Sequence, residues 1–442
     1  MQKTLWIERY ADQGRCVGHI DGRVVFVRFA LPGELVEVEL DEPHQREDRF
    51  WTGEVTRVLE ASPDRVSPPW KLAGPLKDGG GVGGADLIHV SRAGQLKWKQ
   101  TIVAEQMKRL GHVETEVPIE EMPGEDLTGG LHWRTRIEFV TDAEGHPSMH
   151  RRGTNVRVPI DDMPLASQAL LAIAKHKDIW THQYDPNQHI RIAVPEPRDV
   201  FVSADADEDW LSKVVGDNYA ILVDDHLMQG RRELTECIDV QGKRFTYHVD
   251  AGGFWQMHRM APQRLPEHVL YLVRRALQGK TNPVIWDLYS GSGLFTLPLA
   301  VFAGAVDGAD HTDTRVLSIE GAPKAVKHAR KNIKHAGLHN ITALCGDVAK
   351  TLHHVPQGFE HPDVVVLDPP RAGARAQVCK QIVESKAKAV VYIACDATSL
   401  ARDTATLTSH GYELTDIRAF DMYPMTHHVE TVALFTRTKR RK

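Results

Sequence analysis

The chain has 442 residues, of which 42% are hydrophobic and 26% charged, and its formal net charge is −5. This length predicts two or three domains with cores of their own, and the charge excludes a chain that is basic throughout. No apolar run approaches the roughly 18 residues of a membrane helix, and residues 1–15 lack the apolar core of a secretory signal. The five cysteines have neither disulfide nor metal-ligand spacing, so we expect a cytoplasmic protein.

The first two thirds of the chain divide into two predicted domains. Residues 1–62 contain the alternating stretches RVVFVRFA, LVEVEL and WTGEVTRVLE, with Gly and Pro between them, which predicts a small β-barrel. Residues 70–260 begin with the glycine-rich KDGGGVGGAD and an amphipathic helix over 91–110. Strand-like pieces such as KRFTYHVD then alternate with helical ones such as LASQALLAIAKHK, which predicts an α+β central domain.

Residues 263–442 alternate regularly between strand-like and helical stretches. The strand candidates are VIWDL, RVLSIE, ITALC, DVVVLD, AVVYIA and YELTDIRAF, and the last part of the chain is a predicted strand pair. Continuous apolar strands separated by helices are typical of a doubly wound, parallel sheet that is covered on both faces. The predicted fold class is therefore α/β, with a Rossmann-like domain at the C-terminus.

A glycine turn and several acids mark the strand ends of this domain. Gly291 and Gly293 follow the first strand, while Glu320 and Asp347 end the next two strands. Glycines at a strand-to-helix turn let a ligand approach the backbone, and an acid can accept hydrogen bonds from ribose. The third glycine of the dinucleotide fingerprint is missing, which favours S-adenosylmethionine over a nicotinamide cofactor. A turn without any ligand remains an alternative.

Three further residues are candidates for chemistry at the same edge. Asp368 ends the fourth strand in VVVLDPPRAG, and Cys395 ends the fifth in AVVYIACD. Glu430 interrupts the apolar run HHVETVALF, where a buried carboxylate would have a raised pKa suited to proton abstraction. A thiolate at position 395 could attack an electrophilic carbon. From the residues alone, two alternatives remain open. Cys395 could be an ordinary buried residue of the core, and Glu430 could be a solvent-exposed acid on an edge strand.

With these motifs, the chain resembles the uracil-5 RNA methyltransferase family over nearly its whole length. DLYSGSGLFTLPLA, LDPPRAG, YIACDATSLARD and MTHHVETV are similar to the methyltransferase motifs of the family, in the same order. GHIDGRVVFVRFALPGELVEVEL resembles its N-terminal TRAM domain, which corresponds to the predicted barrel. HWRTRIEFV and FWQMH resemble its central domain.

The resemblance implies a reaction and a role for individual residues. It implies methyl transfer from S-adenosylmethionine to C5 of a uridine in tRNA or rRNA, with Cys395 as nucleophile and Glu430 as general base. Gln256, Tyr289 and Glu320 match positions around the cofactor and the target base, as does Asp368. The implied partner is RNA, with no membrane and no protein partner, and we expect a monomer.

The chain also departs from the family pattern. Many relatives bind an iron–sulfur cluster through four cysteines, but Val82, Ala85 and Met163 stand at places of its ligands, so we expect no cluster and no metal. Leu294 replaces a polar residue in the glycine turn, and Ala397 replaces a proline after the cysteine.

The predicted barrel is also acidic. Residues 1–60 carry 12 Asp and Glu against 8 Lys and Arg, a poor match to phosphate. RNA contact is therefore expected from arginines of the central domain: Arg134, Arg136, Arg151, Arg152 and Arg157.

Two other functions remain as alternatives. A cytosine-5 RNA methyltransferase also needs a thiolate at C6, but it is expected to carry a cysteine beside the proline of the fourth-strand motif, which here reads Asp-Pro-Pro-Arg. A catalytically lapsed RNA-binding protein would account for Ala397, Leu294 and the acidic barrel. The sequence does not identify the RNA or the uridine.

Overall fold

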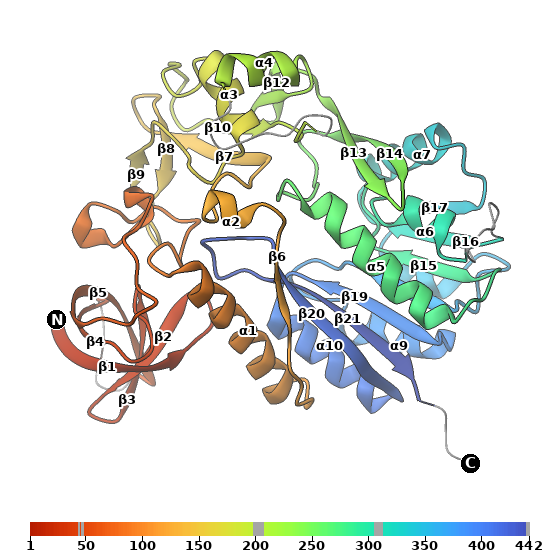
Figure 1. The fold of residues 1–442 in the computed structure, drawn as a ribbon, viewed down its shortest axis with the longest axis horizontal. Coiled ribbons are helices and arrows are strands. Elements are labelled where there is room, and N and C mark those ends of the chain that lie inside the picture. The colour runs from red at the N-terminus through yellow and green to blue at the C-terminus, as the bar shows by residue number, and fades with distance from the viewer. Residues whose placement is uncertain (43–44, 46–47, 198–206, 305–312, 439–442) are drawn as a thin grey trace.

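A computed structural model describes residues 1–42, 45, 48–197, 207–304 and 313–438. Within them the chain forms a closed barrel, a central antiparallel sheet and a large mixed sheet (Figure 1), which confirms the predicted fold class. Residues 439–442, the end of the basic tail, lie outside the described ranges. No helix in these ranges is long and apolar enough to cross a membrane.

The N-terminal barrel is built from five strands in the order β1-β2-β3-β5-β4. Their bounds are β1 (Gln2–Tyr10), β2 (Arg15–Ile20), β3 (Arg23–Arg28), β4 (Leu35–Leu40) and β5 (Phe50–Glu60). The alternation in LVEVEL places Val36, Val38 and Leu40 inside the barrel. The intervening Glu37 and Glu39 point outward, as the two-residue period of a strand requires.

Helix α1 (Arg92–Arg109) follows the barrel after the short turns η1 (Lys71–Ala73) and η2 (Leu76–Asp78). It begins at a Ser91 cap, whose hydroxyl accepts from the N–H of Gly94 at 3.1 Å. The indole N–H of Trp98 donates to the Ala11 carbonyl at 3.2 Å, and its ring lies 4.8 Å from that of Tyr10. Helix α1 is thereby fixed against the barrel.

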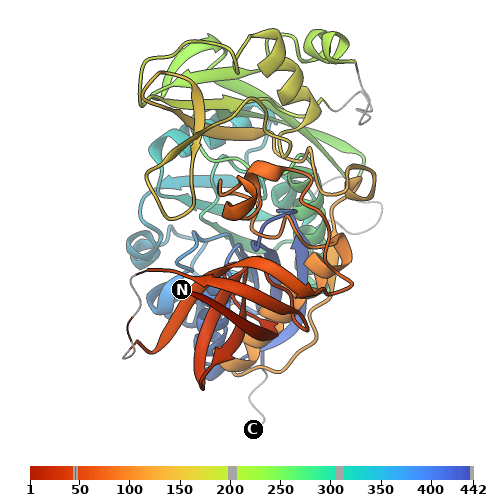
Figure 2. The ribbon, with the colours of Figure 1, turned by 90° about the vertical axis from the view of Figure 1, so that its left-hand side faces the viewer.

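The central domain is a six-stranded sheet in the order β12-β11-β10-β7-β8-β9, covered by short helices. The strands are β7 (Arg136–Thr141), β8 (Pro147–His150), β9 (Arg157–Pro159), β10 (His189–Ala193), β11 (Ala220–Val223) and β12 (His226–Gly230). The helices are α2 (Glu125–Thr128), α3 (Gln168–His176) and α4 (Glu208–Val215). Figure 2 shows this sheet in the upper half of the molecule and the barrel in the lower half.

The C-terminal domain is built on an eight-stranded sheet in the order β17-β16-β15-β18-β19-β21-β20-β6. The strands are β15 (Val284–Leu288), β16 (Arg315–Glu320), β17 (Ile341–Cys345), β18 (Val364–Leu367), β19 (Ala389–Ala394), β20 (Tyr412–Asp421) and β21 (Glu430–Arg437). Strands β15 to β19 are parallel, and β21 is antiparallel to both of its neighbours.

Helices cover both faces of this sheet. They are α5 (Ala261–Leu277), α6 (Thr296–Phe302), α7 (Pro323–His335), α8 (Val348–Thr351), α9 (Arg375–Ser385) and α10 (Ala397–Ser409), with a turn η3 (Leu352–His354). Val364 and Val366 belong to the core under α5 and α6, whereas Val365 and Leu367 belong to the core under α9 and α10. The continuous apolar run of β18 therefore reflects burial on both faces.

Elements from before residue 263 also pack on this domain, among them helix α1, whose Val103 and Met107 share a core with α9 and α10. The hairpin of β13 (Glu233–Val240) and β14 (Lys243–Asp250) shares its core with α5 and contacts α7. The three-residue strand β6 (Ile119–Glu121) pairs with β20 in parallel and forms the edge of the sheet. The sequence analysis did not predict β6, because three residues are too few to show a period.

Candidate active site

A cavity of about 760 Å³ lies at the carboxyl edge of the parallel strands. Its wall contains all but one of the predicted site residues: Gln256, Tyr289, Gly291, Glu320, Asp347, Asp368, Cys395 and Glu430. The exception, Gly293, donates its N–H to the Ser290 carbonyl at 2.9 Å within the turn and is not part of the wall. The carboxyl ends of the five parallel strands thus meet at one cavity, as the doubly wound topology requires, and the first residue of β21, Glu430, joins them.

The glycine turn is shaped around the Glu320 carboxylate. This carboxylate accepts from the N–H of Gly291 at 3.0 Å and from the N–H of Ala322 at 2.7 Å. Gly291 has φ +55, with open space where a Cβ would stand, so the backbone is accessible from the cavity. Tyr289 has φ +61, an unfavourable conformation for an aromatic residue, which the turn holds at the cavity wall.

Buried carboxyl groups gather on the same side of the cavity. Burial, together with the charge of Glu320, raises the pKa of Asp287 to about 7, although the hydrogen bond from Thr296 lowers it. Burial also raises the pKa of Asp368 to about 7, with contributions from Asp287 and Glu320. Asp347 has a different environment, since it caps α8 and accepts from the Lys350 N–H at 2.9 Å.

This donor set fits a cationic nucleoside. Asp287 Oδ1 is buried and has no hydrogen-bond partner among the described residues. A ligand with a positive charge would relieve the repulsion between the Asp287, Glu320 and Asp368 carboxylates, and ribose hydroxyls could donate to them. S-adenosylmethionine has both features.

The strand register brings Cys395 and Glu430 close to one another at the cavity wall. Strands β19 and β21 pair antiparallel with Ala394 opposite Thr431, so the next positions of the ladder are 395 and 430. Directly opposed residues of an antiparallel pair have Cβ atoms about 5 Å apart. Glu430 also pairs with Phe420 of β20 and is only 2% exposed.

The environment of the cysteine disfavours its thiolate in the free protein. Burial raises the pKa of the Cys395 thiol to about 12, and the charges of Glu430 and Asp368 contribute to this rise. The guanidinium of Arg371 acts in the opposite direction. A cationic ligand and a protonated Glu430 would each make the thiolate easier to form.

The two oxygens of Glu430 differ in their surroundings. Oε2 accepts from the Tyr423 hydroxyl at 3.3 Å, while the buried Oε1 has no hydrogen-bond partner among the described residues. Burial raises the pKa of Glu430 well above its ordinary value, and the charge of Asp368 adds to the effect. This carboxyl group can therefore hold a proton at neutral pH.

Several residues of the cavity wall were not predicted. Tyr423, His427 and His428 belong to the loop between β20 and β21, and Asp86 belongs to the glycine-rich segment before α1. His427 Nδ1 lies 2.6 Å from Asp86 Oδ2, which ties this segment to the loop. The sequence stretch DMYPMTHHVE contains these loop residues, but nothing in it indicates which side chains face inward.

The departures from the family pattern have clear structural positions. Val82 and Ala85 are buried, and so is Met163, all three within one apolar core. Among the described residues, no group of three or more His, Cys, Asp or Glu side chains could hold a metal ion. Leu294 lies on the cavity wall, where its carbonyl accepts from the Tyr247 hydroxyl at 3.0 Å.

Two of the arginines expected to contact RNA are used within the fold, which corrects that expectation. Arg136 is buried and donates to the carbonyls of Asp250, Ala251 and Gly253. Arg152 donates to the carbonyls of Ala73, Gly74 and Val82. Backbone acceptors that bind a guanidinium in this way leave it no free face for phosphate.

Arg134 has a different position. It lines the cavity and lies next to the Trp133 ring, with the guanidinium carbon 5.1 Å from the ring centroid.

The chain is similar to known families. A sequence model described as tRNA (Uracil-5-)-methyltransferase matches residues 223–438, and one described as TRAM domain matches residues 3–46. A protein of Bifidobacterium longum described as an RNA methyltransferase is 61% identical, covering 99% of this chain and 97% of its own. The 23S rRNA (uracil(1939)-C(5))-methyltransferase RlmD of Shewanella amazonensis is 29% identical, covering 98% and 95%.

A solved structure has the same overall fold. The tRNA (uracil-54, C5)-methyltransferase of Pyrococcus abyssi, in complex with S-adenosyl-L-homocysteine, superposes with a TM-score of 0.63. It covers 98% of this chain and 100% of its own at 19% identity.

Proposed function

Because this chain belongs to the tRNA (uracil-5-)-methyltransferase family, with an N-terminal TRAM domain, we propose that it methylates C5 of a uridine in RNA. The observation that supports this most strongly is that Cys395 and Glu430, each next to the last β19–β21 pair of Ala394 with Thr431, both line a cavity rich in carboxylates. A thiol and a carboxyl group at adjacent positions are what C5 methylation of a pyrimidine needs.

The cofactor in this proposal is S-adenosylmethionine. Glu320 and Tyr289 at the glycine turn, with Asp347 and Asp368 nearby, are the residues that would hold it, and Gln256 lies on the same wall. When bound, S-adenosylmethionine supplies an electrophilic methyl group next to the target base. The buried carboxylates favour binding of the positively charged S-adenosylmethionine over its neutral product, S-adenosylhomocysteine.

The chemistry of the base begins at Cys395. Its thiolate forms a bond to C6 of the uracil ring, and the electrons of the C5–C6 double bond move to O4 as an enolate, which makes C5 nucleophilic. After C5 has gained its methyl group, the Glu430 carboxylate removes the C5 proton. The C5–C6 double bond then re-forms, and the sulfur leaves C6 with its electron pair.

The base must leave its stack to reach this cavity. Phe254 lies on the wall and is 71% exposed, so its ring is available for stacking on an unpaired base. The two relatives with named targets act on 23S rRNA and on tRNA. Both RNA classes are therefore candidate substrates.

RNA that contains 5-fluorouridine tests this proposal. Fluorine on C5 cannot be removed as a proton is, so wild-type protein with S-adenosylmethionine is expected to stay attached to the RNA on a denaturing gel. Unmodified tRNA and 23S rRNA fragments provide the two substrate arms, and Cys395→Ala is the control that must not be trapped. Absence of a trapped complex with both RNA classes would favour a lapsed RNA-binding protein.

Glu430 has a separate signature in the same assay. Glu430→Gln is expected to be trapped by 5-fluorouridine at the wild-type rate, because trapping precedes proton removal. On ordinary RNA it should accumulate the covalent complex, whereas unchanged turnover would remove Glu430 from its proposed role.

A further inference from the structure

The β20–β21 loop, residues 422–429, contains Tyr423, whose hydroxyl contacts Glu430, the proposed general base. Tyr423 Oη donates to Glu430 Oε2 at 3.3 Å, and Tyr423 lines the cavity. Its ring lies 6.0 Å from the Trp133 ring and 6.0 Å from the His428 ring, at steep angles to both. Oε1 of Glu430 has no hydrogen-bond partner among the described residues, which leaves it open to accept a proton from a bound nucleobase.

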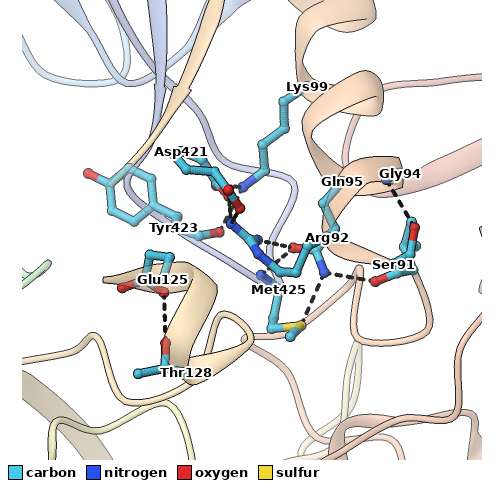
Figure 3. A network of polar contacts seen from close by, with 12 residues as sticks. Ser91, Arg92, Gly94, Gln95, Lys99, Glu125, Thr128, Asp421, Tyr423 and Met425 are labelled. Atoms are coloured by element: carbon cyan, nitrogen blue, oxygen red, sulfur yellow. Dashed lines mark hydrogen bonds and ion pairs between the residues drawn. The ribbon is translucent and has the colours of Figure 1, made fainter. Parts of the chain in front are cut away.

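Helix α1 holds this tyrosine from behind. Lys99 donates to the Tyr423 carbonyl at 2.8 Å and also to the Asp421 carboxylate (Figure 3). Arg92, two turns earlier on α1, donates to Asp421 at 2.5 Å and to Glu121 of β6 at 2.8 Å. The side chains of Lys99 and Asp421 are fully buried.

A second contact from α1 fixes the next part of the loop. Gln95 Oε1 accepts from the Met425 N–H at 2.8 Å, and the Met425 carbonyl accepts from the Leu87 N–H at 2.9 Å. Met425 has φ +65, a conformation that a non-glycine residue keeps only when its surroundings impose it. The loop is therefore held in a defined shape by residues about 330 positions earlier in the chain.

A buried charge cluster of this kind is poorly explained by stability alone. Removing Lys99 and Asp421 from water costs about as much as their attraction returns. What the cluster does provide is a fixed geometry for the backbone of residues 421–423.

We propose that Tyr423 is a positioning residue for the general base, held by Lys99 and Gln95 of α1 so that its hydroxyl orients the Glu430 carboxyl group. This inference rests on the proposed role of Glu430. It assigns Tyr423 to the last step of the reaction, in which the C5 proton leaves, and not to the attack of Cys395 on C6.

The groups around Glu430 determine how the Tyr423 hydrogen bond changes the pKa of its carboxyl group. Asp368 after β18 and Cys395 after β19 face the carboxyl group from the sheet, and Arg371 and His428 approach the cysteine side of the cavity. Burial and Asp368 raise the pKa of Glu430, whereas the Tyr423 hydrogen bond lowers it. A donor to the carboxylate stabilises its charged form, so loss of the hydroxyl should raise this pKa.

Tyr423→Phe tests the inference, with Tyr412→Phe as matched control. Tyr412 lies on β20 as well and donates its buried hydroxyl to the Ala387 carbonyl at 2.7 Å, away from the cavity. For Tyr423→Phe we expect turnover on ordinary RNA to fall about tenfold, with unchanged KM. The acid limb of its pH–rate profile should move up by roughly one unit. On ordinary RNA the covalent complex of Tyr423→Phe should accumulate. RNA that contains 5-fluorouridine should trap this variant at the wild-type rate.

The outcomes separate this inference from the proposed function. If wild-type protein is not trapped, the proposed function fails. If wild type is trapped but Tyr423→Phe keeps the turnover and acid limb of wild type, the positioning role is wrong. Slower trapping of Tyr423→Phe would also overturn it, because the tyrosine would then act in the attack on C6. Thermal unfolding of both variants controls for the fold.

Discussion

At the scale of single residues, the reactivity of Cys395 depends on what occupies the cavity. Burial and the charges of three carboxylates, Glu430, Asp368 and Asp396, raise the pKa of its thiol, and the Arg371 guanidinium lowers it. A nucleophile in this state is protected in the free protein and becomes reactive when positive charge enters. Arg371 therefore favours the Cys395 thiolate before any ligand binds.

Alkylation by iodoacetamide measures this effect. With a thiol pKa of about 12, the thiolate fraction of Cys395 should rise about tenfold per unit between pH 7 and pH 9, without a plateau. Labelling followed by mass spectrometry should show Cys395 reacting far more slowly than the exposed Cys345, an internal reference. The variant Arg371→Gln should slow the alkylation of Cys395 further, and Arg371→Lys should slow it to a smaller extent. Equal labelling of both cysteines at pH 7 would contradict this description.

Residue identity could be predicted from sequence more readily than residue surroundings. Cys395, Asp368 and Glu430 each interrupt or end an apolar run, which is a local signal. The hydrogen bond of Tyr423 to Glu430 and the contact of Asp86 with His427 depend on tertiary placement. Arg136 illustrates the reverse, since a basic residue in a strand gives no indication that backbone carbonyls bind it.

At the scale of elements, the ends of β15, β16 and β18 form an acidic wall, in which Glu320 and Asp368 line the cavity and Asp287 is buried nearby. Asp287 and Asp368 both have a pKa raised to about 7, so they are largely protonated below that pH and charged above it. A positively charged ligand binds better when these groups are charged, and its binding releases their protons.

The pH dependence of cofactor binding tests the role of this wall. S-adenosylmethionine carries a positive sulfonium, and S-adenosylhomocysteine is its neutral counterpart. Between pH 5.5 and pH 8.5, calorimetry should show the preference for S-adenosylmethionine rising roughly tenfold, as the carboxylates ionise. Equal pH dependence for both ligands would mean that the wall does not recognise the charge.

Long, regular elements were predictable, and short ones were not. The apolar runs of β15, β18 and β19 and the strand pair at the end of the chain agree with the structure. The three-residue β6 is too short to show a period. It pairs with β20, which lies more than 290 residues later in the chain. The division at 1–62, 70–260 and 263–442 stays a prediction, since β6 and the β13–β14 hairpin pack on the C-terminal domain.

At the scale of the whole molecule, helix α1 connects the barrel to the active-site loop. Trp98 packs against Tyr10 of the barrel, and Lys99, the next residue, binds the backbone of Tyr423. The barrel carries more acidic than basic residues, so its contribution to RNA binding cannot come from charge alone. Helix α1 is therefore one physical connection between the barrel and the loop that lines the proposed site.

In the proposed reaction, the sulfur of Cys395 bonds to a uracil ring next to a methyl donor. Mass spectrometry of the complex trapped with 5-fluorouridine RNA tests it most directly, after digestion with trypsin and nuclease. We predict that the peptide of residues 389–402 carries one nucleotide with both fluorine and a new methyl group, attached at Cys395. A nucleotide attached elsewhere, or one without the methyl group, would contradict the account.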